Sequence, residues 1–126
     1  MDLTNVKTWN FGIDNDNLVR LVLSGDKRAT TSLFNSYVDE PLPKIGDLGI
    51  LVYSDNKKAC ITKITDVIIT EFKNIDSTLA KLEGEGDKSL EYYRKVHNDF
   101  FKEFFPDFND DTLVVFEIFE VVEKLS

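Results

Sequence analysis

One short segment of the chain, Ser24-Gly25-Asp26-Lys27-Arg28-Ala29-Thr30-Thr31-Ser32, carries a lysine, an arginine and several hydroxyl groups. Lys27 and Thr30 are an amine and an alcohol that could do chemistry together. A desolvated lysine has a lowered pKa and can accept a proton. Thr30 could then attack a carbonyl carbon or donate a hydrogen bond to a developing oxyanion. The same spacing also fits a cation at a helix C-terminus followed by a strand threonine, and the spacing alone favours this structural interpretation.

A second group of reactive side chains lies in the acidic stretch Glu83-Gly84-Glu85-Gly86-Asp87. Glycines on both sides of Glu85 let its backbone approach a ligand closely. A carboxylate beside Lys27 would raise the pKa of the lysine, so Glu85 could share the work only by carrying a proton. The alternative is a solvated acidic loop in which Asp87 caps the next helix. With no fixed partner elsewhere in the sequence, we expect no metal site here.

Two further residues could contact a ligand. His97 falls on the apolar face of a helical pattern, which favours a buried histidine with a satisfied hydrogen bond over an orienting role in a site. Tyr37 could stack on a planar ligand, although packing explains it equally well.

The elements that would position these residues follow from the periodicity. A helix after Asp14 ends at Gly25, and in the strand that follows Thr30 and Ser32 share one face while Thr31 lies on the other. A strand at 49–53 and a second from residue 58 form a hairpin, with a bulge near 63–65. A short helix through residue 82, a longer helix from 90 to Pro106 and a last strand at 112–122 complete the chain. This order predicts an α+β fold: a small mixed β-barrel of five or six strands with about three flanking helices, in one domain spanning residues 1–126.

Composition limits the partners. The net charge of −8 disfavours broad binding to DNA or long RNA. No apolar run approaches the roughly 20 residues of a membrane helix, and the N-terminus lacks the basic segment of a signal peptide, so we expect a soluble cytoplasmic protein with no membrane partner. The single cysteine, Cys60, permits no internal disulfide and is expected to be a buried, inert thiol.

Taken together, these segments resemble the ASCH domain family, in its branch of small stand-alone bacterial proteins. The resemblance rests on the order and spacing of Trp9-Asn10-Phe11-Gly12, Leu23 to Leu33, Pro41 to Asp47, and Glu83 to Phe101. It implies a PUA-like β-barrel with a cleft and a link to RNA or nucleoside chemistry. One branch of the superfamily removes the acetyl group from N(4)-acetylcytidine, and other members are reported as ribonucleases.

The Lys, Thr and Glu of the amidohydrolase branch map onto Lys27, Thr30 and Glu85, with Glu83 as the alternative acid. We expect the substrate to be contacted by Arg28, Ser32, Tyr37, Glu83 and His97. We expect no cofactor. Three functional hypotheses follow: a small hydrolase acting on an amide of a modified nucleoside, an RNA-binding module or ribonuclease, and an ASCH fold whose catalytic residues are vestigial.

Overall fold

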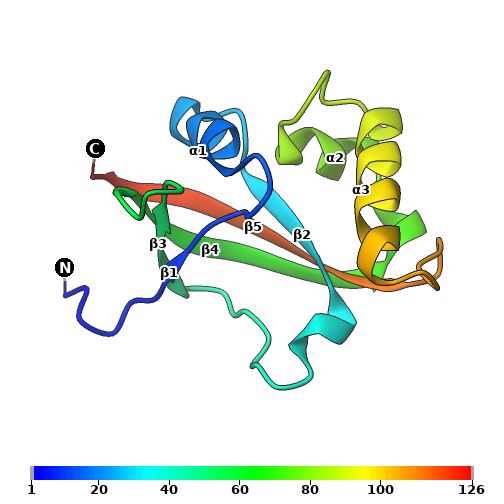
Figure 1. Ribbon diagram of the computed structural model, residues 1–126, viewed down its shortest axis with the longest axis horizontal. Coiled ribbons are helices and arrows are strands. Elements are labelled where there is room, and N and C mark those ends of the chain that lie inside the picture. The colour runs from blue at the N-terminus through cyan, green and yellow to red at the C-terminus, as the bar shows by residue number, and fades with distance from the viewer. Residues whose placement is uncertain (1, 126) are drawn as a thin grey trace.

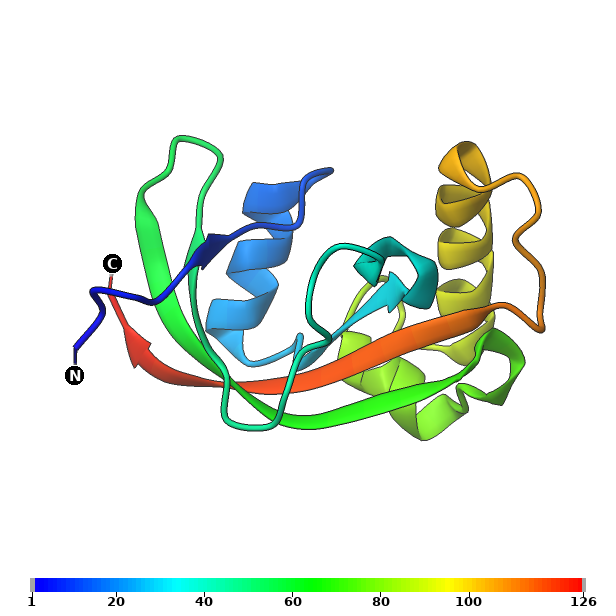
Figure 2. The same ribbon diagram turned by 90° about the horizontal axis from the view of Figure 1, so that it is seen from below.

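The computed structural model describes residues 2–125, which form three α-helices, two 3₁₀ turns and a five-stranded mixed sheet (Figures 1 and 2). No helix in this range is long and apolar enough to cross a membrane. In chain order the elements are β1 (Thr8–Trp9), α1 (Asn15–Ser24), β2 (Ala29–Leu33), η1 (Phe34–Tyr37), β3 (Leu48–Val52), β4 (Lys58–Glu71), η2 (Phe72–Asn74), α2 (Ser77–Glu83), α3 (Leu90–Phe104) and β5 (Leu113–Lys124).

The strands are ordered β1-β3-β4-β5-β2, with β1 parallel to β3 and every other neighbouring pair antiparallel. The predicted β3–β4 hairpin is confirmed. The predicted bulge is confirmed as well, because the β4–β5 register shifts between Ile64 and Asp66. Strands β1 and β2 stand at the two edges and do not pair with each other, so the sheet is curved but open. The predicted barrel is therefore not confirmed, whereas the mixed α+β class is.

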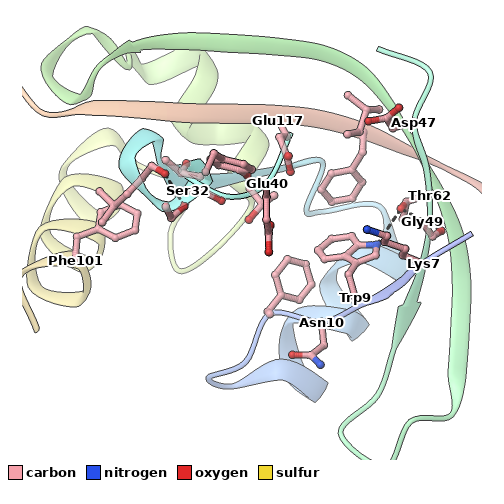
Figure 3. A pocket seen from close by; sticks show the side chains of 18 of the residues that line it. Lys7, Trp9, Asn10, Ser32, Glu40, Asp47, Gly49, Thr62, Phe101 and Glu117 are labelled. Carbon is pink, nitrogen blue, oxygen red and sulfur yellow. Dashed lines mark hydrogen bonds between the residues drawn. The ribbon is translucent and has the colours of Figure 1, made fainter. Parts of the chain in front are cut away.

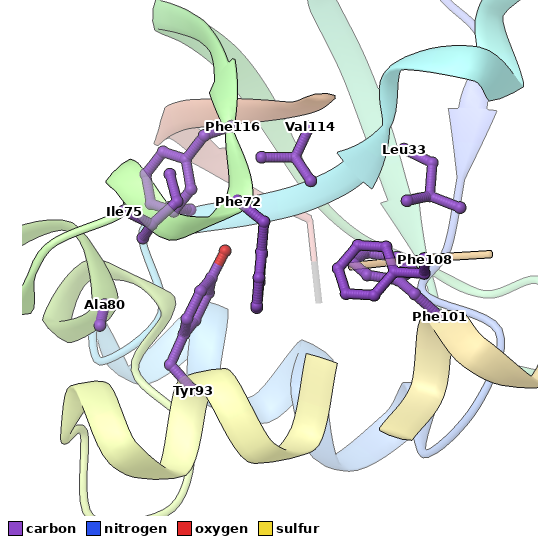
Figure 4. Close-up of a cluster of buried hydrophobic side chains, with 10 residues drawn as sticks. Leu33, Phe72, Ile75, Ala80, Tyr93, Phe101, Phe108, Val114 and Phe116 are labelled. Carbon is purple, nitrogen blue, oxygen red and sulfur yellow. The ribbon is translucent and has the colours of Figure 1, made fainter. Parts of the chain in front are cut away.

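Two apolar clusters lie on opposite faces of β5, since successive side chains of a strand point to opposite sides. Phe116 belongs to the cluster formed with α2, α3 and the inward face of β2, which Figure 4 shows around Phe72, Tyr93 and Phe101. Phe119 belongs to the cluster beneath α1, with Val19, Val22, Leu51, Ala59 and Cys60. The two helical layers thus cover different faces of the sheet, and β2 contributes to the cluster of α2 and α3.

The α1–β2 corner is built around glycine. Gly25 ends α1 with φ 89°, a left-handed conformation that glycine adopts without the steric cost of a Cβ. Gly84, at the end of α2, packs against this corner so closely that an added Cβ would lie 2.0 Å from the Asp26 carbonyl oxygen. The backbone N–H of Arg28 donates to the carbonyl of Leu82, which joins the same two segments.

The start of α3 differs from the sequence-based expectation. Ser89, not Asp87, is the N-cap, and its hydroxyl accepts the backbone N–H of Tyr92. Asp87 instead accepts the backbone N–H of Ser89, which stabilises the turn before the helix. Asp87 lies two residues before the N-cap, so its carboxylate accepts a hydrogen bond from the loop backbone rather than from the first turn of the helix. The amino-acid composition of the segment does not distinguish these two positions.

Candidate active site

The ammonium group of Lys27 lies in a buried acidic cluster where the α1–β2 corner meets the end of α2. Its side chain is 1% exposed, and Nζ donates to Oε1 of Glu83 at 2.5 Å and to the Glu83 backbone oxygen at 3.1 Å. Nζ also donates to Oε2 of Glu85 at 2.8 Å. Glu83 is the last residue of α2, and Glu85 follows in the glycine-flanked loop, so one short segment brings both carboxylates to the lysine.

The second oxygen of Glu83 is held by groups from β2 and α3. The hydroxyl of Thr31 donates to Oε2 at 2.6 Å, and Nε2 of His97 lies 3.3 Å from the same atom. Thr31 is also hydrogen-bonded to the hydroxyl of Tyr93 at 2.8 Å, and Nδ1 of His97 lies 2.9 Å from the Tyr93 carbonyl oxygen. Among residues 2–125 no buried side-chain polar atom lacks a partner, as expected for charged groups removed from water.

The electrostatics divide the cluster into fixed charges and one adjustable group. Burial lowers the pKa of Lys27, but the charges of Glu83 and Glu85 outweigh it and raise the pKa overall, so the lysine is an ammonium ion without the free electron pair a base needs. Burial likewise opposes the charge on Glu83, yet Lys27 and His97 hold the pKa of this carboxyl below its usual range. Burial disfavours a charged His97 too, but the hydrogen bond and charge of Glu83 raise its pKa.

Glu85 is the adjustable group. Burial raises the pKa of Glu85, and Lys27 offsets this only in part because the charge of Glu83 stands nearby. Its side chain is 21% exposed, against 3% for Glu83. Of the two carboxylates on Lys27, Glu85 is therefore the one that takes up a proton first as the pH falls and the one that water or a ligand can reach.

A cavity of about 690 Å³ lies beside this cluster (Figure 3). Thr31 and Phe11 belong to both: Thr31 lines the cavity while bonding to Glu83, and the Phe11 ring lines it while its centroid lies 5.3 Å from Nζ of Lys27. Lys27 and the two glutamates lie behind these side chains rather than in the cavity wall. The rest of the wall combines aromatic rings, hydroxyls and acids: Trp9, Thr30, Ser32, Tyr37, Glu40, Asp47, Phe100, Phe101, Phe104, Glu117 and Phe119, among others.

Comparison with known proteins identifies this architecture. The family model of the ASCH domain matches residues 7–123, nearly the whole chain. The chain belongs to the ASCH domain family. This family is PUA-like in fold. No curated protein matches the chain.

Several solved structures resemble this ASCH domain. The ASCH domain from Lactobacillus crispatus JV V101 is 34% identical, with a TM-score of 0.86 over 95% of this chain and 81% of its own. Protein EF3133 from Enterococcus faecalis V583 is 31% identical, with a TM-score of 0.86 over 100% of this chain and 86% of its own. The ASCH protein from Zymomonas mobilis is 10% identical, with a TM-score of 0.57 over 96% of this chain and 71% of its own, a likeness of fold alone.

Within this ASCH domain the residues singled out from the sequence fall into three places. Lys27, Glu83, Glu85 and His97 meet in the buried cluster, and Thr30, Ser32 and Tyr37 line the cavity. Arg28 belongs to neither group. Its backbone carbonyl accepts the N–H of Phe119, and its guanidinium packs beside Gly25.

Three residues of the site were not assigned a role from the sequence: Thr31, Tyr93 and Glu117. The strand period alone places Thr31 on the face opposite Thr30, but which face meets Glu83 depends on how α2 docks. Tyr93 was indistinguishable from an ordinary core aromatic. Glu117 did carry a signal, since it is the one acid in the otherwise apolar stretch from residue 113 to 119. Within residues 2–125, no group of three or more His, Cys, Asp or Glu side chains is arranged to hold a metal ion.

Proposed function

We propose that this ASCH domain is a small hydrolase that cleaves an amide bond of an uncharged ligand, such as the modified nucleoside N(4)-acetylcytidine, bound in the cavity. One observation carries the proposal: a buried ammonium ion bridges two carboxylates, one of them ionised and buried, the other partly open with a raised pKa. This arrangement pairs a fixed positive charge with a proton carrier beside a cavity whose size suits a small-molecule ligand.

The roles follow from the charges. In the proposed reaction Glu85, which does not line the cavity, acts as carboxylate through one intervening water: it takes up a proton from the attacking water while the oxygen of that water bonds to the amide carbon. The carbonyl π electrons move onto the amide oxygen, where the Thr30 hydroxyl in the cavity wall donates a hydrogen bond. The Lys27 ammonium, behind Phe11 and Thr31, stabilises the negative charge through its field without contacting the oxygen. When the C–N bond breaks, Glu85 returns its proton to the leaving nitrogen. The products are a carboxylic acid and an amine, so atoms and charges balance.

Glu83 and His97 act through Lys27 in this scheme. Glu83 is held ionised by Lys27, Thr31 and His97, and it keeps the ammonium charged and in place. Lys27 therefore serves as an electrostatic group rather than as the base.

The charge of the cavity favours an uncharged ligand over RNA. The cavity lining includes three acidic residues, Glu40, Asp47 and Glu117, and one lysine, Lys7. The whole chain has a formal net charge of −8. A polyphosphate entering such a site would meet repulsion, whereas RNA-binding sites gain affinity by neutralising phosphates with Lys and Arg. These charges therefore make RNA binding or RNA cleavage the weaker functional hypothesis.

The test is incubation with N(4)-acetylcytidine and chromatographic measurement of cytidine release. Glu85→Gln removes the proton carrier but keeps the shape, so kcat should fall by about 10²- to 10⁴-fold while circular dichroism shows that the variant remains folded. Glu91→Gln, on the exposed start of α3, is the matched control and should keep full activity. Absence of cytidine release by the unaltered protein, or equal release by Glu85→Gln, would contradict the proposal. Cleavage of RNA, with affinity that falls steeply as salt rises, would favour the ribonuclease reading instead.

A further inference from the structure

The carboxyl group of Glu117 points into the cavity and has no part in the proposed bond cleavage (Figure 3). Glu117 lies on β5 directly opposite Thr30 on β2, so both side chains project from the same face of the sheet. The side chain is half-buried, and its two neighbours along the strand, Phe116 and Ile118, face the apolar cluster of α2 and α3 on the other side of the sheet. Because burying a carboxyl group costs free energy that an apolar residue would avoid, this position calls for an explanation beyond packing.

The cavity also presents a fixed aromatic surface. The Trp9 ring packs edge-on against Phe11 and Phe119, with centroids 4.9 and 5.8 Å away. Its indole N–H donates to the hydroxyl of Thr62 at 3.2 Å, and Gly49 gives it room, since a Cβ there would lie 2.8 Å from the ring. Trp9 is thus held in one orientation and offers a flat apolar face on which a planar ligand can stack.

The charges around Glu117 decide which ligands fit. Asp47, in the turn before β3, and Glu40, in the loop after η1, are exposed at the mouth, together with Lys7 from the segment before β1. Tyr37 from η1 also faces the carboxyl group. Three acids against one lysine attract hydrogen-bond donors and repel anions. A ligand that carries N–H groups but no phosphate matches this lining.

We propose that Glu117 is the specificity-determining residue of this cavity: its carboxylate accepts hydrogen bonds from the amino edge of a planar heterocycle stacked on Trp9, and the acidic mouth excludes the phosphorylated form of the same compound. The inference rests on the proposed function for the nature of the ligand, a nucleoside. It goes beyond it by naming the group that selects an amino heterocycle and the charge state of the ligand.

The binding should depend on pH in a defined direction. Burial and the nearby charge of Asp47 raise the pKa of Glu117 to about 7, and Tyr37 opposes this shift only in part. The ionised carboxylate accepts a charge-assisted hydrogen bond from the exocyclic amino group, and protonation removes the charge that strengthens this bond. Affinity for an amino heterocycle should therefore rise as the pH increases through about 7.

Trp9 provides the readout, because it is the single tryptophan of the chain and lines the cavity. Its fluorescence is titrated with cytidine, with uridine, which has a carbonyl where cytidine has an amino group, and with cytidine 5′-monophosphate. Cytidine should bind about tenfold to a hundredfold more tightly than either of the others, the range of one charge-assisted hydrogen bond gained or lost. This measurement needs no turnover.

Variants separate a recognition role from a structural one. Glu117→Gln should bind cytidine and uridine within about threefold of each other and lose the pH dependence, because its amide can both donate and accept. Asp47→Asn should keep the selectivity but move the midpoint of the pH dependence to lower pH. Glu120→Gln, exposed on the same strand, is the control and should behave like the unaltered protein.

The outcomes discriminate between the two proposals. Equal affinity for the three compounds, no change in Trp9 fluorescence with any of them, or unchanged selectivity in Glu117→Gln would overturn the assignment of Glu117. Selective cytidine binding without cleavage of N(4)-acetylcytidine would leave that assignment standing and refute the hydrolase. Cleavage of N(4)-acetylcytidine without selective binding of cytidine would support the hydrolase and refute the assignment of Glu117.

Discussion

Replacing Lys27 with methionine removes a charge from the centre of the buried cluster while keeping most of the side-chain volume. Glu83, 3% exposed, would lose two of its hydrogen bonds and retain those to Thr31 and His97. Breaking a buried ion pair by removing one partner costs about 3–5 kcal/mol, because the remaining charge is left uncompensated in a medium that solvates it poorly. A domain of this kind has a total stability of about 5–15 kcal/mol, so Lys27→Met should remain folded but with a much reduced free energy of unfolding.

The loss of stability in Lys27→Met should depend on pH in a defined direction. In the unaltered protein the pKa of Glu83 is lowered on folding, so its stabilising contribution is present above the unfolded-state pKa of roughly 4.3 and is lost as the pH falls through the lower folded-state value. Without Lys27, burial dominates and the pKa of Glu83 rises. The variant is then least stable relative to the unaltered protein at neutral pH, and the difference should shrink as the pH falls toward about 4, where the buried carboxyl becomes neutral.

The assay is urea denaturation followed by circular dichroism at neutral and mildly acidic pH. Lys88→Met is the matched control: the Lys88–Asp26 pair is partly exposed on both sides, so its loss should cost about 0–1 kcal/mol with little dependence on pH. The double variant Lys27→Met/Glu83→Gln should recover part of the loss, because it removes the stranded charge. A cost below about 1 kcal/mol for Lys27→Met, equal at both pH values, would refute the reasoning that a charged, buried ion pair organises this corner.

Three further predictions test neighbouring features. His97 is the single histidine, and its pKa is raised on folding, so its contribution to stability should be complete below about pH 6.5 and be lost as the pH rises through the folded-state pKa. The difference in unfolding free energy between the unaltered protein and His97→Gln measures this contribution. A difference that does not depend on pH would contradict the prediction. Gly84→Ala should cost about 3 kcal/mol or more in urea denaturation, because it adds a clash with the Asp26 backbone to a left-handed φ of 72°, whereas Gly12→Ala has φ 79° and open space and should cost only about 1–2 kcal/mol; similar costs would show that the clash is relieved. Burial raises the pKa of Cys60 to about 11, so the folded protein should not react with a thiol reagent near pH 8 until urea unfolds it; rapid reaction without urea would contradict the burial.

Several parts of the fold could be predicted from the chain because the signals are local. A glycine after an apolar helical run marks the end of α1, and Pro106 follows closely after the end of α3. The broken alternation near Ile64 required a bulge, since no single register places all its apolar side chains on one face. The open edges of the sheet were beyond this reasoning, because the number and order of strands that fit a barrel also fit a strongly curved open sheet.

In the candidate site, too, some features follow from the sequence and others only from the tertiary structure. The sequence by itself determined the inventory: one lysine after a glycine corner, neighbouring hydroxyls on alternating faces of a strand, and two glutamates separated by a glycine. Only the tertiary structure decided that both glutamates contact Lys27, that Thr31 rather than Thr30 bonds to Glu83, and that Thr30 faces the cavity with Glu117. The physical reason is that these choices depend on the docking of α2 and α3 against one face of β2, which is set by long-range packing rather than by the spacing of neighbouring residues.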